Sequence, residues 1–125
     1  MSMRQPKEAE KYILKALSYG QKVDNPQRMA VLNGMASEVY HHMGQDEQSL
    51  DYATRAYDME RDLGRQDKMA IRQAHRASAL ISLKRSAEAE KALGEAIPGL
   101  RESGNRHSLG IACNQMGLLK HQQQN

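Results

Sequence analysis

A repeat of 40 residues constrains this chain more than any other feature of its sequence. When the 125 residues are compared with themselves at an offset of 40, a set of small and apolar columns agrees in chemical class without a gap. Small residues sit where two helix axes approach closely, and apolar residues where a face is buried. The repeat therefore predicts stacked, equivalent units. Three columns show the pattern: Ala16, Ala56 and Ala96; Met29, Met69 and Leu109; and Ser37, Ala77 and Gly117.

Each 40-residue period is expected to hold two helices. No segment alternates β-branched or aromatic residues with polar ones, so strands are not expected. Short connections make neighbouring helices antiparallel, and equal repeats then stack in one direction. We predict an all-α fold, an α-α superhelix (a right-handed solenoid) of about six helices forming one domain over residues 1–125. The expected helices are 6–23, 26–43, 46–63, 67–83, 86–103 and 106–121, in the periods 6–43, 46–83 and 86–121.

Several residues mark where these helices should begin and end. Asn25 reads as an N-cap followed by proline in the first turn, and Asp46 and Ser86 are expected to cap later helices. Pro98 falls inside an expected helix, which predicts a kink or an early end near Ile97. Glycines just past helix ends are expected in the left-handed conformation. They are Gly44, Gly64 and Gly104.

The composition narrows the possible classes of protein. Aromatic residues make up 4%, without Phe or Trp, so Ala, Leu, Ile and eight Met must fill the core. The net charge of +3 is much smaller than the positive charge that nucleic-acid-binding domains usually carry. Cys113 is the single cysteine, which excludes an intrachain disulfide. No apolar stretch approaches the roughly 20 residues that cross a bilayer, and we expect a cytoplasmic protein.

Two kinds of segment resemble the tetratricopeptide repeat (TPR) family, in its long 40-residue variety. Residues 35–57 read MASEVYHHMGQDEQSLDYATRAY, similar to the family's order of small, aromatic, Gly, acidic, small, aromatic and Ala positions. Residues 62–70 read DLGRQDKMA and resemble the turn between long repeats, with a weaker echo at 102–110. The chain departs from the family pattern at three positions. They are Arg76 in an apolar column, Ala53 in an aromatic column and Lys84 in place of a glycine.

The resemblance implies a non-catalytic protein- or peptide-binding scaffold, the sensor or adaptor part of a larger regulatory protein. In TPR proteins the first helix of each repeat lines a concave groove, which suits an extended peptide or a helix. A basic and Asn clamp for a C-terminal carboxylate, found in some members, is absent here. By resemblance, the candidate groove residues are Val31, Gly34, Glu38, His41, Ala74, Ser78, Ile81, Asn114 and Leu118.

A basic stripe is expected along one helix. Lys68, Arg72 and Arg76 are spaced at i, i+4 and i+8, which places them on one helical face. One interpretation is that they form salt bridges with acidic residues of an adjacent helix. The other is that they bind an acidic segment of a partner. Binding of nucleic acid to the same residues is a less favoured form of the second interpretation, because aromatic residues do not interleave with the charges.

Catalytic and metal-binding patterns do not stand out. No nucleophile has a partner base at a recognisable spacing, so we expect no enzymatic activity and no cofactor. Cys113 is expected to be an inert core thiol, and Glu60 to belong to a solvated acidic helix end. His41 and His42 point about 100° apart on a helix, which disfavours a shared metal ion. We therefore expect no metal site.

The ends of the repeat array suggest an alternative function. In the register of the TPR resemblance, the segment 26–43 is the first helix of a repeat, so the chain opens with the second helix of one repeat and closes with the first helix of another. Apolar residues of the last helix, from 109 to 119, spread around more than one face. An exposed apolar patch usually marks an interface. We therefore expect either that these residues belong to a longer array, or that the chain forms a homodimer through residues 109–119. Self-association is thus the alternative function to peptide binding.

Overall fold

The computed structural model describes residues 4–23 and 25–123, and nearly all of them are helical. No strand occurs within these ranges, so the predicted all-α fold is confirmed, and each predicted helix matches an observed one to within two residues. None of the described helices combines the length and apolar character that a membrane crossing requires. The helices are α1 (Arg4–Val23), α2 (Pro26–His42), α3 (Asp46–Leu63), α4 (Gln66–Ser82), α5 (Ser86–Glu102) and α6 (Arg106–Gln123).

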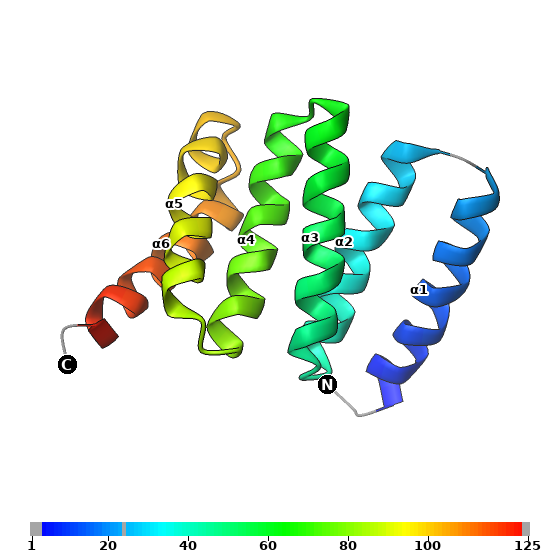
Figure 1. The fold of residues 1–125 in the computed structure, drawn as a ribbon, viewed down its shortest axis with the longest axis horizontal. Helices are drawn as coiled ribbons and strands as arrows, with labels where there is room; N and C mark the ends of the chain where they lie inside the picture. Colours follow the sequence, from blue (N-terminus) through cyan, green and yellow to red (C-terminus); the bar gives the residue numbers. More distant parts are fainter. Residues whose placement is uncertain (1–3, 24, 124–125) are drawn as a thin grey trace.

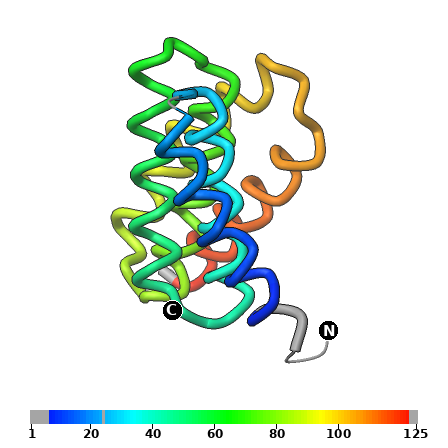
Figure 2. Tube along the Cα trace, turned by 90° about the vertical axis from the view of Figure 1, so that its right-hand side faces the viewer, coloured from blue at the N-terminus to red at the C-terminus, as the bar shows by residue number. Residues whose placement is uncertain are grey.

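The helices follow one another across the molecule in chain order, each packed against the next (Figure 1). Viewed from the α1 end, the turn between α5 and α6 lies to one side of the turn between α3 and α4 (Figure 2). The row of helices therefore twists along its length. This arrangement is a helical-repeat architecture, in which contacts join elements close in sequence.

Short capping interactions explain most helix boundaries. The Asn25 side chain accepts a hydrogen bond from the Arg28 backbone N–H, as predicted for an N-cap. The glycines after α2, α3 and α5 have φ of 74°, 70° and 75°, which confirms their left-handed conformation. The turn after α4 has Lys84 with φ 61° at the matching position.

The prediction that Asp46 and Ser86 act as N-caps is wrong. Each is the first residue inside its helix, and the cap positions are held by Gln45 and Arg85, whose side chains make no capping hydrogen bond. Asp46 instead places a negative charge in the first turn of α3, where the helix dipole favours it. The first turn is thus stabilised by charge rather than by a capping side chain.

The predicted early end near Ile97 is also wrong, because α5 continues through Pro98 to Glu102. Pro98 is exposed, whereas Leu100, two residues later, is fully buried. At Gly99, an added Cβ would lie 2.8 Å from the Ala70 Cβ, so α4 approaches the last turn of α5 closely. Burial of Leu100 against the core offsets the hydrogen bond that proline removes.

The core forms two clusters along the row. One joins α1 and α2 through Ile13, Leu17, Leu32 and Ala36. The other is larger, joins α4, α5 and α6, and consists mainly of Ala and Leu. Small side chains allow these helices to pack closely without aromatic residues, as the composition predicted.

Candidate functional site

The inner face of the helix row is formed by α2, α4 and α6. Among the described residues, Cα atoms of α2 and α4, and of α4 and α6, approach within 8 Å, whereas no Cα atoms of α1 and α3, or of α3 and α5, do so. The even-numbered helices therefore lie closer together than the odd-numbered ones. This geometry gives the row a concave side along α2, α4 and α6, the helices that carry all nine candidate groove residues.

The structure leaves most of these candidates accessible. Val31 and Leu118 are 38% and 55% exposed, and Glu38, His41 and Asn114 are exposed as well. Ala74, Ser78 and Ile81, in the middle helix, are half-buried. The accessible candidates therefore lie on α2 and α6, and the half-buried ones lie on α4 between them.

Gly34 is a candidate groove residue that the structure does not leave accessible. It is buried, and an added Cβ would lie 2.6 Å from Cζ of Arg72. The Arg72 guanidinium from α4 thus fills the position that the missing side chain leaves on α2. Gly34 serves the packing of α2 on α4, and we remove it from the groove.

Two polar pairs link the groove helices. His75 Nε2 lies 3.1 Å from Glu38 Oε1, joining α4 to α2, and this hydrogen bond lowers the pKa of the Glu38 carboxyl. Gln115 on α6 donates to the Ser78 hydroxyl on α4 at 2.9 Å. Two buried atoms, His75 Nδ1 and Gln115 Oε1, have no hydrogen-bond partner among the described residues. The groove floor therefore presents polar atoms with unused hydrogen-bonding capacity.

The sequence reasoning missed His75 and Gln115 as groove residues. Both lie in one column of the 40-residue repeat with Met35, which is 45% exposed on α2. That shared column is the signal that could have placed them on the inner face.

Two residues of the basic stripe, Arg72 and Arg76, interact with other residues of this protein. Arg72 is 8% exposed, and its Nε lies 3.6 Å from Oε2 of Glu60, which is fully buried. Arg65 contacts the same carboxylate, with Nε 2.9 Å from Oε1. Arg76 donates to Thr54 and Gln73. Burial lowers the pKa of Arg72, although Glu60 and Glu38 oppose that change.

Glu60 was expected on a solvated helix end, and its burial corrects that expectation. A carboxylate can be buried because two guanidinium groups compensate its charge, one from the α3–α4 turn and one from α4. Lys68, the third residue of the stripe, is half-buried. The stripe is thus mainly an internal connection between α3 and α4.

An apolar depression opens beside Val31, with a volume of about 480 Å³. Its apolar wall comes from Tyr12, Val31 and Met35, on α1 and α2. Arg28 and Arg65 lie on its polar side. The depression therefore combines an apolar surface with positive charge at one end of the groove.

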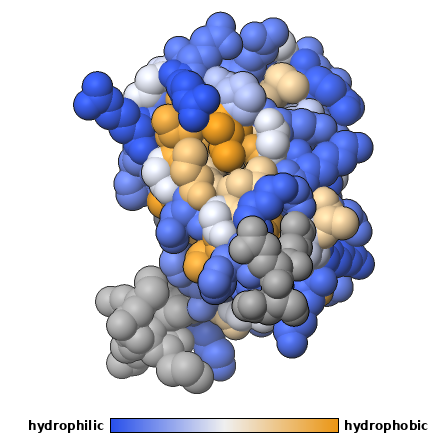
Figure 3. Space-filling view, turned by 90° about the vertical axis from the view of Figure 1, so that its left-hand side faces the viewer, coloured by the Kyte–Doolittle hydropathy of each residue, from blue (hydrophilic) through white to orange (hydrophobic). Residues whose placement is uncertain are grey.

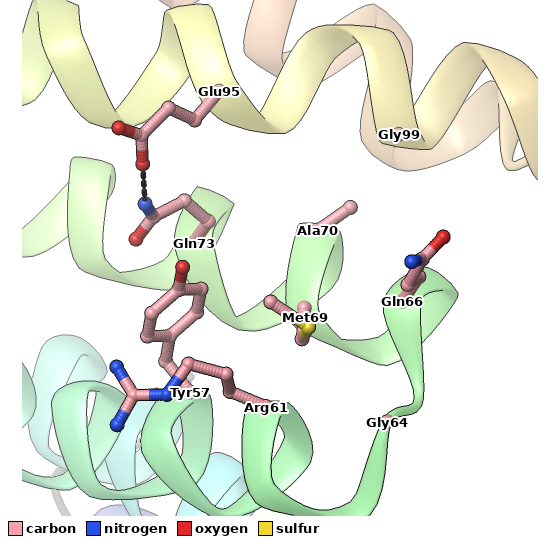
Figure 4. Close-up of a pocket in the computed structure, with 9 residues that line it drawn as sticks. All are labelled: Tyr57, Arg61, Gly64, Gln66, Met69, Ala70, Gln73, Glu95 and Gly99. Atoms are coloured by element: carbon pink, nitrogen blue, oxygen red, sulfur yellow. Dashed lines mark hydrogen bonds between the residues drawn. The ribbon is translucent and has the colours of Figure 1, made fainter.

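A second depression, of about 370 Å³, lies between α3, α4 and α5 (Figure 4). Gln73 donates a hydrogen bond to Glu95 across it, and the Tyr57 hydroxyl points toward Gln73. Gly99 occupies the repeat column of Met59, so the missing side chain helps to leave this space. Its lining offers hydrogen bonds to a small polar group and contains no Ser, Cys, His or Lys.

Cys113 is exposed, so the expectation of a core thiol is wrong. The buried face of α6 is formed instead by Ala112 and Leu119, and Cys113 lies beside it on the helix.

Within the described ranges, no three His, Cys, Asp or Glu residues are grouped so that they could hold a metal ion. His41 approaches Asp46, with 4.0 Å between Nδ1 and Oδ1.

No family model and no curated protein matches this chain. The resemblance to tetratricopeptide repeats therefore stays a prediction from the sequence. The fold, by contrast, rests on the six packed helices themselves.

Proposed function

We propose that this chain is a non-catalytic, TPR-like scaffold that binds an extended peptide segment of a partner protein along α2, α4 and α6. We place it in the cytoplasm, as the sensor or adaptor part of a regulatory protein. The observation that carries the proposal is the apolar depression beside Val31, bordered by Arg28 and Arg65 and continuous with the exposed groove residues of α2. Such a site favours a partner with an apolar side chain next to an acidic residue.

The groove floor supports an extended partner. A peptide in extended conformation presents unpaired backbone N–H groups. The Nδ1 atom of His75 and Oε1 of Gln115 lack internal partners, and both can accept such hydrogen bonds when His75 donates from Nε2 to Glu38. Both atoms are enclosed by neighbouring side chains, so a peptide would satisfy them only after displacing those side chains.

Selection from a random peptide library, followed by titration of the selected peptides, tests this function. Met35→Asp is expected to weaken binding by about tenfold or more, because it puts a charge in the apolar depression. Lys91→Glu, on the exposed side of α5, serves as the control and should leave affinity unchanged. If no peptide is selected, or if selected peptides bind Met35→Asp as well as the unmodified chain, the groove proposal is wrong.

Self-association remains the second candidate function, and exposed apolar residues on α6 favour it. Ile111 and Leu118 are 47% and 55% exposed. Light scattering at high concentration, with Leu118→Asp as the comparison, measures it directly. A monomer that Leu118→Asp leaves unaffected contradicts self-association through residues 109–119.

The nucleic-acid alternative loses support from the burial of Arg72, and a salt titration of binding tests it.

A further inference from the structure

Three repeat columns show how an even-numbered helix is covered by the helix that follows it. Ser37 on α2 donates to the backbone carbonyl of Ser49 on α3 at 2.9 Å. Asn33 on α2 lies 3.7 Å from the Met59 sulfur on α3, and Gln73, in the same column on α4, donates to Glu95 on α5. In the third column, Ala70 on α4 packs against Gly99 on α5. The α2 and α4 residues in these columns are all buried.

The same three columns are uncovered on α6. They hold Gly110, Cys113 and Gly117, which are all exposed. A Cβ added at either glycine would meet no atom within 4 Å. Figure 3 views this end of the molecule and shows apolar surface bordered by hydrophilic side chains. We call this face of α6, defined by Gly110, Cys113 and Gly117, the end face.

The charge of α6 differs from that of the helices that cover α2 and α4. It contains no Asp or Glu, and it has Arg106 and His107 near its start and His121 near its end, besides Lys120, whose ammonium pairs with Glu90 of α5. The covering helix α3 carries six acidic residues and two basic ones, and α5 carries four and two. His121 shares a repeat column with His41, which approaches Asp46 of α3. The end face is therefore electrostatically matched to an acidic helix.

The first helix of a second copy has the wrong charge for this position. By repeat register α1 is equivalent to α3 and α5, yet it carries five basic residues and two acidic ones. Docking it on α6 would place lysines opposite the cations of α6. The charges thus disfavour head-to-tail stacking of this chain.

The geometry points to the end face of α6 as a docking surface for an acidic amphipathic helix of a partner protein, packed as α3 packs on α2. The helix should carry small or apolar residues in the pattern shared by α3 and α5. That pattern is Ser49, Ala53 and Ala56 in α3, and Ala89, Leu93 and Ala96 in α5. This surface is separate from the groove, and its occupation does not depend on peptide binding there.

Titration of the full chain with a labelled peptide of residues 46–63 tests the end face, with fluorescence anisotropy as the readout. Gly117→Glu is expected to weaken binding by at least about tenfold, because it would bury an unpaired carboxylate beneath the peptide. The added side chain meets no atom in the free protein, so the melting temperature should not fall. Gln122→Glu places the same charge at an exposed position of α6 outside the three columns, and should change binding far less.

Two further peptides separate the possible occupants. A version of residues 46–63 with Gln in place of Ser49 and Ala56 should bind weakly, because larger side chains prevent close approach. A peptide of residues 4–23 should also bind weakly. Absent binding of the 46–63 peptide, equal binding to Gly117→Glu, or tighter binding of the 4–23 peptide would each overturn the inference. Met35→Asp should leave this binding intact, which separates it from the groove.

Discussion

The helix pair α2–α3 and the helix pair α4–α5 occupy equivalent places in the repeat, yet different chemistry holds them together. In α2–α3, Ser37 and Ser49 exchange hydrogen bonds, and Tyr40 and Tyr52 stack with their rings 5.4 Å apart. The corresponding residues of α4–α5 are Ala77 with Ala89 and Leu80 with Ala92, all buried in one apolar cluster. The repeat thus specifies the spacing of the helices. At the closest contact, a pair of Ser residues and a pair of Ala residues are both small enough for that spacing.

The same contrast extends to the far end of each pair. Glu60 of α3 is buried and ion-paired with Arg65 and Arg72, whereas Leu100, in the same column of α5, packs in the apolar cluster. A charged residue and a leucine thus hold equivalent buried positions. The difference teaches that a repeat column fixes burial more strongly than polarity, provided that partners compensate any buried charge.

The largest effect is expected from breaking the buried ionic cluster. Glu60→Leu should lower the free energy of unfolding by about 3–5 kcal/mol, because Arg72 would remain buried without its counter-ion. The double variant with Arg72→Leu should recover much of that loss, since the matching columns hold Leu100 and Leu32. Chemical denaturation measures both. A double variant as unstable as the single one would contradict the equivalence of the two pairs.

A smaller loss is expected where both pairs have the same residue. Ala56 and Ala96 share a column and are fully buried. Ala56→Leu should destabilise the protein by about 1–3 kcal/mol through overpacking, and Ala96→Leu by a similar amount. Thermal melting compares the two variants. An unchanged midpoint for Ala56→Leu would show that the repeat register is wrong.

A stabilising change of about 1 kcal/mol is expected at the turn after α4. Lys84 has φ 61°, in the left-handed region that Gly44 occupies in the equivalent turn after α2. Lys84→Gly should therefore raise the free energy of unfolding, because glycine adopts this conformation without a Cβ clash. Lys84→Ala is the control and should give no comparable gain. Loss of stability in Lys84→Gly would mean that the lysine side chain contributes more than its backbone strain costs.

The smallest effect concerns the contact between the two inner helices, α2 and α4. The hydrogen bond from His75 lowers the pKa of Glu38 below its ordinary value of 4.5. A lowered pKa in the folded state adds stability above the unfolded value, and this stability is lost as pH falls through the folded value. Wild type should therefore lose more stability than Glu38→Gln below pH 4.5. The Glu38 side chain is 59% exposed, so solvent screening keeps the difference small.

Much of the fold was predictable because it depends on local patterns. Helix spans, left-handed glycines and the Asn25 cap follow from spacing and backbone conformation. The candidate site was predictable only in outline. Repeat register placed Val31, Glu38 and Leu118 on accessible inner helices, but it could not show that Arg72 covers Gly34. That contact depends on how far one long side chain reaches across two helices.

By itself, the sequence determined the number, length and order of the helices, because a 40-residue pattern of small and apolar residues allows few other arrangements. The tertiary structure alone decided which polar residues are buried. The sequence allowed an ion pair between Arg72 and an acidic residue of an adjacent helix, but only the packing of α3 on α4 selects Glu60 as that residue and buries both. It also decided that Pro98 lies within a helix, since burial of Leu100 outweighs a local rule. Interactions between residues that are distant in sequence depend on how the helices pack, and the local spacing of residue types does not encode that packing.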